Sequence, residues 1–312
     1  QKSQSKTVTA QGGSVVQDFA IFALEYDENK HFFLSQFFRN RYDYWLRSYP
    51  YVDNRVQISR IEVWVTNKQN RINTTENNSR NIIALQDLGE GTLHTKPIVT
   101  GATPEEITSQ TVGFVAGGES AAQFFNSVNT TEPGEYDPFP NNGNNKLDPG
   151  MIGSGGYLQS SIRQIVTTSD SSFGTLADKA DEGVDYVKLE NARKLTTSEY
   201  TLNANLGYIS LNTKLNNDEV LAVAYQYTVG DKVYQVGEFG TDGVDATNAT
   251  TTTTDTGATQ VTGVSTQSLI LKMIKSSLIN VTEPTWNLMM KNIYQIPNGY
   301  QLSQEDFTLN IL

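Results

Sequence analysis

The side chains that could do chemistry are few in this chain of 312 residues. It has two histidines, His31 and His94, and no cysteine, which excludes disulfides, thiolate metal ligands and cysteine nucleophiles. A serine hydrolase needs a base within hydrogen-bonding reach of its nucleophile, and neither histidine has a serine or acidic neighbour at a spacing that favours a triad. His31 precedes Phe32 and Phe33, which is typical of a residue at the start of an aromatic helix.

Two pairs of adjacent acids raise the question of glycoside hydrolysis, which uses two carboxylates that face each other across the substrate. The pairs are Glu105-Glu106 and Asp218-Glu219. Both stand in turn or helix-start contexts, where acidic residues are favourable and solvated. We therefore predict no catalytic residue and no cofactor.

Residues 132–156 consist almost entirely of turn formers and include one pattern that is reminiscent of a calcium loop. Oxygen-bearing side chains surround Gly143 within residues 137–148, as hard cations require. The pattern departs from an EF-hand because Pro138 follows the first acid and Asp148 stands at the twelfth position, where a bidentate glutamate is expected. A solvated loop is favoured over a calcium site, and no metal ligand is predicted.

The clearest structural signal lies in residues 183–240, which read as a β module. Ile209 and Leu211 alternate with polar neighbours, the period of a half-buried strand. Residues 220–227 are apolar on both faces, which predicts a central strand. Turns are predicted at 203–207 and 230–231, the second as a two-residue hairpin.

The residues before this module indicate a mixed α+β unit. Strands are predicted near 15–24, 60–66 and 80–86, and a helix near 30–47. Trp64 falls on the polar side of its strand; packing over its own sheet is favoured, and contact with a partner is the alternative.

The residues after the module differ in composition. The Thr-rich stretch 241–267 has little apolar surface to bury and is expected to be a linker or mobile loop. Residues 268–275 are expected to be helical, and a second helix is expected to open at Pro284. Its stripe of Trp286, Met289, Met290 and Ile293 is typical of a core, with a docking groove as the alternative. Alternation at 307–311 predicts a final strand.

These signals together predict a mostly β, α+β chain with sandwich-like modules and a few helices. The predicted division is 1–90 as a mixed module, 91–181 as a loop-rich excursion, 182–240 as the β module, 241–267 as a linker, and 268–312 as a helical segment that leads to a strand. The net charge of −11 disfavours nucleic acid and anionic membrane surfaces as partners. No segment approaches the roughly 18 apolar residues of a membrane-spanning helix.

Long sequence blocks resemble the SprA/Sov family, the outer-membrane translocon of the Bacteroidetes type IX secretion system, which is linked to gliding motility. The blocks are SKTVTAQGG (5–13), YDENKHFFLSQFFRNRYD (26–43), VQISRIEVWVTNKQN (56–70), NIIALQDLGE (81–90), DYVKLENARKLTTSEYTLNANLGYISLNTKLNNDEVLAVAYQYT (185–228) and EPTWNLMMKNIYQI (283–296). They keep their order over most of the chain. They are therefore more specific than a short motif.

The resemblance implies a very large outer-membrane β-barrel that passes cargo proteins. Only 37% of this chain is hydrophobic and its mean hydropathy is −0.42, so we expect it to be a soluble insertion of such a protein. Its expected partners are the rest of the barrel chain, exported cargo and other secretion components. Bacterial barrels carry their longer loops outside, which favours an extracellular cap over a periplasmic extension. A surface adhesin and, less favoured, a secreted hydrolase are the alternative functions.

Overall fold

The computed structural model describes residues 9–11, 14–16, 20–47, 49–52, 56–68, 79–86, 152–153, 158–176, 180–229, 232–241, 247–253, 259–281 and 284–296. Its strands are β1 (Thr9–Gln11), β2 (Ser14–Val16), β3 (His31–Phe33), β4 (Val56–Val65), β5 (Ser79–Leu85), β6 (Tyr186–Lys194), β7 (Tyr200–Asn203), β8 (Tyr208–Leu211), β9 (Leu221–Val229), β10 (Lys232–Val236), β11 (Thr247–Thr253), β12 (Thr259–Thr266) and β13 (Leu269–Lys275). Its helices are α1 (Gln36–Leu46), α4 (Pro284–Leu288) and the 3-10 helices η3 (Ser160–Arg163) and η4 (Asp170–Leu176). The prediction of a mostly β chain with few helices is confirmed.

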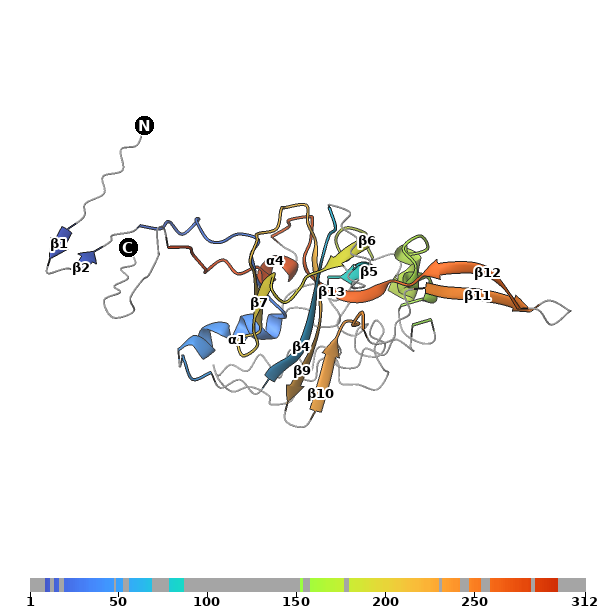
Figure 1. Ribbon diagram of the computed structural model, residues 1–312, viewed down its shortest axis with the longest axis horizontal. Coiled ribbons are helices and arrows are strands. Elements are labelled where there is room, and N and C mark those ends of the chain that lie inside the picture. The colour runs from blue at the N-terminus through green and yellow to red at the C-terminus, as the bar shows by residue number, and fades with distance from the viewer. Residues whose placement is uncertain are drawn as a thin grey trace, which may run out of the picture.

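Five strands of the largest sheet form a closed circuit, as their pairings show. β9 pairs antiparallel with β4 and with β13, β13 pairs parallel with β5, and β6 pairs antiparallel with both β5 and β4. β10 extends the sheet by pairing with the C-terminal half of β9. The predicted central strand is confirmed, because β9 is bonded along both of its edges. Figure 1 shows β4, β9 and β10 running side by side.

The inner face of this circuit is a small apolar core. Its members come from the five strands, from the residue before β9 and from the residues after β10: Trp64, Ile82, Ala84, Leu189, Ala192, Val220, Ala222, Ala224, Phe239, Leu269, Leu271 and Met273. Several are alanines, because a sheet that closes on only five strands leaves little interior volume. Trp64 is 1% exposed within this core, so the favoured interpretation, that it covers its own sheet, is confirmed.

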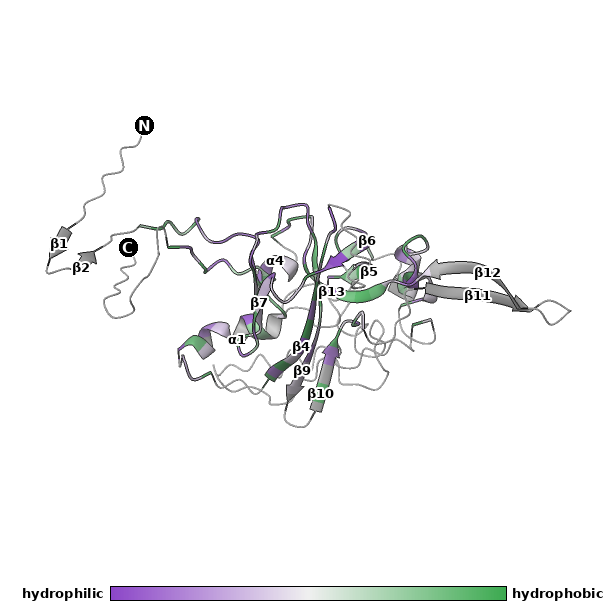
Figure 2. Cartoon of the chain, in the orientation of Figure 1, coloured by the Kyte–Doolittle hydropathy of each residue, from purple (hydrophilic) through white to green (hydrophobic). Residues whose placement is uncertain are grey.

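The outer face of the circuit shares a larger core with the remaining elements. Val63, Ile83, Tyr225 and Ile270 contribute from the circuit. Phe32, Phe38, Ile209 and Met289 contribute from β3, α1, β8 and the end of α4. The three-stranded sheet β3-β8-β7 therefore packs on the six-stranded sheet through a common core, as sandwich-like modules require. Figure 2 shows the hydrophobic colouring concentrated on strands such as β13, at the centre of the molecule.

The two hairpins of the predicted β module are present. β7 and β8 pair around the turn at 204–207, and Gly207 has a φ of 66°, the left-handed region that glycine tolerates best. β9 and β10 pair with Val229 opposite Lys232, so two residues connect them. In β8, Ile209 and Leu211 are buried and their polar neighbours are not, as the alternation predicted.

Two buried carboxylates fasten loops to the closed sheet. Glu62 accepts hydrogen bonds from the Trp64 indole nitrogen at 3.3 Å and from the Gly240 backbone nitrogen at 2.9 Å. Glu238, 2% exposed, receives both guanidinium nitrogens of Arg163, at 2.7 and 2.8 Å, and the Ile270 backbone nitrogen at 2.8 Å. Because each carboxylate has several donors, its burial leaves no unpaired charge.

The C-terminal third corrects two predictions. Residues 269–275 form strand β13 and not a helix, because all seven side chains are buried and such a run has no alternation to distinguish strand from helix. The stretch expected to be a linker contains β11 and β12, which pair as a two-stranded ribbon that Figure 1 shows extending away from the sheet. Threonine is β-branched and favours strands even where it buries little apolar surface.

The N-terminal third corrects two more boundaries. The helix expected over 30–47 begins only at Gln36, because residues 31–33 form β3 and pair with β8. Of the strand expected over 15–24, residues 15–16 belong to β2, residues 20–24 form no strand, and residues 17–19 lie outside the described residues. The strands predicted at 60–66 and 80–86 are present as β4 and β5.

Within the part of the chain that the structure describes, no helix is both long and apolar enough to span a membrane. The loop predictions at 91–151 and the final strand at 307–311 lie outside the described residues.

Candidate functional site

The candidate site is a polar pocket of about 460 Å³ between the two sheets. Three separate segments line it: the end of β4 and the residues after it, the end of β6 and the turn to β7, and the end of β8 with the loop that leads to β9. The lining residues are Val65, Thr66, Asn67, Lys68, Arg193, Leu195, Ser198, Glu199, Leu211, Asn212, Thr213, Lys214, Leu215, Asn216 and Glu219. Its volume is in the range of small-ligand sites in proteins.

One wall of the pocket carries an ion pair in which one guanidinium nitrogen contacts both carboxylate oxygens. The Nη1 atom of Arg193 donates to Oε1 and Oε2 of Glu199 at 2.8 and 3.0 Å, and the Thr196 backbone nitrogen donates to Oε2 at 2.8 Å. Partial burial acts to raise the pKa of Glu199, but the hydrogen bonds from Thr196 and Arg193 and the guanidinium charge outweigh it. The pKa of Glu199 is therefore below its ordinary value, and the carboxylate is ionised at neutral pH.

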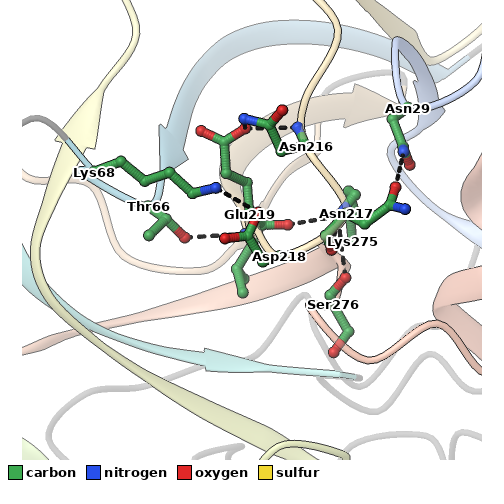
Figure 3. A network of polar contacts seen from close by, with 10 residues as sticks. Asn29, Thr66, Lys68, Asn216, Asn217, Asp218, Glu219, Lys275 and Ser276 are labelled. Atoms are coloured by element: carbon green, nitrogen blue, oxygen red, sulfur yellow. Dashed lines mark hydrogen bonds and ion pairs between the residues drawn. The ribbon is translucent and has the colours of Figure 1, made fainter.

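A second wall of the pocket is the loop 216–219, whose backbone carbonyls accept hydrogen bonds from a buried lysine. The Nζ atom of Lys275 donates to the backbone carbonyls of Asn217 at 3.0 Å and Glu219 at 2.6 Å, and to that of Ser276 at 3.2 Å. Lys275 is 6% exposed, and burial is the main cause that lowers its pKa to about 8, against the attraction of nearby carboxylates. Figure 3 shows Lys275 next to Asn217 of this loop.

The same loop is braced from its other sides. Glu219 caps it by accepting hydrogen bonds from the backbone and side-chain nitrogens of Asn216, at 2.6 and 3.0 Å. The Asn29 amide donates to the Asn217 side chain at 2.9 Å. Lys68 forms an ion pair with the exposed Asp218, and its hydrogen bond is the first cause of the lowered pKa of that carboxyl. The wall is thus fixed by side chains from three other segments (Figure 3).

The charges around the pocket balance. Lys68, Arg193 and Lys214 line it together with Glu199 and Glu219, and Asp218 of the loop wall pairs with Lys68. All three carboxylates are committed to the hydrogen bonds described above. The pocket therefore offers cationic groups, amides and hydroxyls around an apolar floor, which suits binding of a polar ligand.

A second polar cluster lies in the three-stranded sheet, and the sequence did not predict it. His31 is 8% exposed in β3, opposite Ser210 of β8, and its Nδ1 lies 2.7 Å from the Ser210 hydroxyl. Its Nε2 lies 3.3 Å from Oδ2 of Asp27, which also pairs with Lys30 at 3.1 Å. Burial is the main cause that lowers the pKa of His31, so the ring is neutral at neutral pH.

This cluster corrects the prediction for His31, which is a strand residue and not the start of a helix. The contacts with Ser210 arise because antiparallel pairing places residues 179 apart directly across from each other. Sequence spacing carries no signal for such a pair. None of the three residues lines the pocket, and the ring joins the two strands by side-chain hydrogen bonds that replace those lost to water on burial.

The acids that were considered for glycoside chemistry do not face each other across a cleft where the structure describes them. Asp218 bonds to Lys68, whereas Glu219 bonds to Asn216. Glu105, Glu106, His94 and the calcium-like loop 137–148 lie outside the described residues. Met289 and Met290 are buried, as the core interpretation of their stripe predicted. Among the described residues, no group of three or more acids or histidines could hold a metal ion.

Comparison with known families gives one match. The model of the family SprA_N, described as motility related/secretion protein, matches residues 1–235, which is more than half of the chain. The matched range includes β1 to β9 and every residue that lines the pocket. No curated protein sequence matches the chain.

Proposed function

The chain belongs to the SprA_N family of motility-related and secretion proteins, which gives it a role in motility or secretion at the cell envelope. We propose that it is a non-enzymatic domain of the type IX outer-membrane translocon. In this proposal it is an extracellular cap that supports cargo export and gliding. The observation that carries the proposal is the family match over residues 1–235.

The fold supports a rigid structural role. The closed circuit of β4, β9, β13, β5 and β6 leaves few unpaired strand edges, which protects a surface-exposed domain from edge-to-edge association. Buried ion pairs such as Arg163 with Glu238 fix loops to the circuit. A cap that restricts leakage through a wide pore has to keep its shape, and these features provide that.

The resemblance blocks coincide with this rigid body. The block at 56–70 contains β4, and the block at 185–228 contains β6 to β8 and nearly all of β9. The residues that resemble the translocon family thus build β4, β6, most of β5 and β9, and both walls of the pocket. Longer extracellular than periplasmic segments in bacterial barrels favour the outer side of the membrane.

The experiment is deletion of this domain from the complete translocon polypeptide. We expect loss of cargo secretion, impaired gliding and increased entry of large solutes, with the barrel still present in the outer membrane on an immunoblot. Normal secretion together with a normal permeability barrier would show that the proposal is wrong.

A further inference from the structure

We propose that the pocket binds an acidic peptide segment of a protein that the translocon exports or docks. The binding site is inferred from its own lining; only the source of the peptide rests on the proposed function. The ligand class follows from the charge, hydrogen-bonding groups and size of the pocket.

The guanidinium of Arg193 is only partly engaged by the protein. Glu199 engages only its Nη1 atom, so within the described part of the chain the Nε and Nη2 atoms have no protein acceptor. The side chain is 30% exposed and lines the pocket. An arginine with part of its fork available is suited to a carboxylate, which it binds with directed hydrogen bonds.

Lys214 lies on the loop after β8 and is exposed at the pocket. The structure gives its ammonium group no acceptor among the described residues, whereas Lys68 is paired with Asp218. Lys214 and Arg193 are therefore the two cationic groups available to an incoming anion. A carboxylate side chain between them would have its charge compensated by the site.

The rest of the lining combines polar side chains with apolar ones. Asn212, Thr213 and Ser198 bring amide and hydroxyl groups, which match the donors and acceptors of a peptide backbone. Leu195 and Leu211 are nearly buried and form part of an apolar floor that aliphatic side chains can contact. A short extended peptide presents this combination of backbone amides, small apolar groups and a carboxylate.

The lining and the net charge of the chain favour a peptide over a nucleic acid as the ligand. Bound nucleobases normally stack on aromatic side chains, and the described lining contains none. A nucleic acid would also meet the net charge of −11. A single carboxylate on a peptide can reach the available nitrogens of Arg193 and Lys214 without a polyanion's repulsion from the rest of the chain.

The loop wall of the pocket is ordered before a ligand binds. Lys275, Glu219 and Asn29 hold the loop wall through backbone and side-chain hydrogen bonds before any ligand arrives. A wall that is already ordered reduces the conformational entropy lost on binding.

The test measures binding of the complete 312-residue chain to a short fluorescein-labelled peptide that alternates glutamate and valine, followed by fluorescence anisotropy. The comparison peptide has glutamine in place of each glutamate. We expect the acidic peptide to bind more tightly, and its affinity to fall as ionic strength rises from about 50 to about 200 mM. Lys214→Glu should weaken it about tenfold, because the change removes one attraction and adds a repulsion.

The matched control is Arg47→Glu, the same reversal of charge at an exposed residue that does not line the pocket. It should leave the affinity unchanged. Equal binding of the glutamine peptide, equal weakening by both variants, or preference for a neutral oligosaccharide would overturn the assignment. This result is independent of the deletion experiment, since a pocket that binds the peptide in a translocon that does not need the domain would refute only the proposed function.

Discussion

The buried ammonium group of Lys275 should make the stability of the protein rise with pH in a range where most proteins lose stability. Burial lowers the pKa of Lys275 from 10.5 to about 8, and the unfolded chain returns it to its ordinary value. Between these two pKa values the unfolded chain binds more protons than the folded one. The free energy of unfolding therefore increases with pH through this group.

The magnitude follows from the two pKa values. At about 1.4 kcal/mol per pH unit, the difference between 10.5 and about 8 means that the charged form costs about 3.5 kcal/mol at neutral pH. Part of this cost remains at intermediate pH. From about pH 7 to about pH 9.5 the wild-type protein should gain about 2 kcal/mol relative to Lys275→Met, which has no group to titrate.

The assay is urea unfolding of both proteins at a series of pH values, followed by tryptophan fluorescence. The tyrosines with raised pKa values, such as Tyr186, titrate in both proteins and cancel in the comparison. Lys291→Met is the matched control, because burial also lowers the pKa of Lys291 to about 8 but its contacts are with the carbonyls of Trp286 and Met289. The stability difference between wild type and Lys291→Met should rise with pH in the same way, and Lys291→Met should leave peptide binding unchanged. Lys275→Met should weaken peptide binding, because it removes the hydrogen bonds that hold the loop wall.

A stability difference between wild type and Lys275→Met that is independent of pH would refute this reasoning. A difference that falls as pH rises would show that the three carbonyl acceptors favour the charged form more strongly than burial disfavours it.

Three further predictions concern single positions. Glu238→Gln should lower the free energy of unfolding by about 3 kcal/mol because it leaves the half-buried guanidinium of Arg163 without its counter-charge. Glu199→Gln, in a more exposed pair, should cost less than about 1 kcal/mol, and equal costs in urea unfolding would contradict the burial argument. Gly207→Ala should cost about 3 kcal/mol, since a Cβ there would lie 2.0 Å from a buried phenylalanine ring at a φ of 66°; Gly183→Ala, with a φ of 91° and a flexible leucine at 3.3 Å, should cost about 1 kcal/mol, and a smaller effect at Gly207 in thermal unfolding would be inconsistent with the packing. His31 is neutral in the folded protein and protonates on unfolding, so its contribution should fall as pH drops below about 6.5; His31→Gln should show a flatter acid limb in a pH series of unfolding, and an unchanged limb would contradict the assignment.

The sequence allowed good predictions where a strand has one buried and one solvated face. In β8 the alternation of Ile209 and Leu211 with polar residues was sufficient, and the glycine of its turn had an identifiable conformational role. β13 was predicted as a helix because its seven residues are all buried, and a uniformly apolar run carries no period. Its parallel pairing with β5, nearly 190 residues away, supplies the missing information.

The candidate site could not be predicted for a related reason. Its lining residues are ordinary amides, hydroxyls and charges on three segments, and none forms a motif with its sequence neighbours. Arg193 and Lys68 come together because β6 and β4 are paired at Trp64 and Val65. Of the wall residues, the sequence singled out only Asp218 and Glu219, as a solvated acid pair, without indicating that Lys275 holds their loop from below.

The most direct measurement is surface labelling of intact cells that carry an epitope inserted in the connection between β11 and β12, at residues 254–258, in the full-length protein. An insertion between these paired strands leaves their ladder in place. If the domain is an extracellular cap, an antibody should label the cells without permeabilisation and to the same extent after it. Labelling that appears only after the outer membrane is opened would contradict the extracellular cap and place the domain in the periplasm.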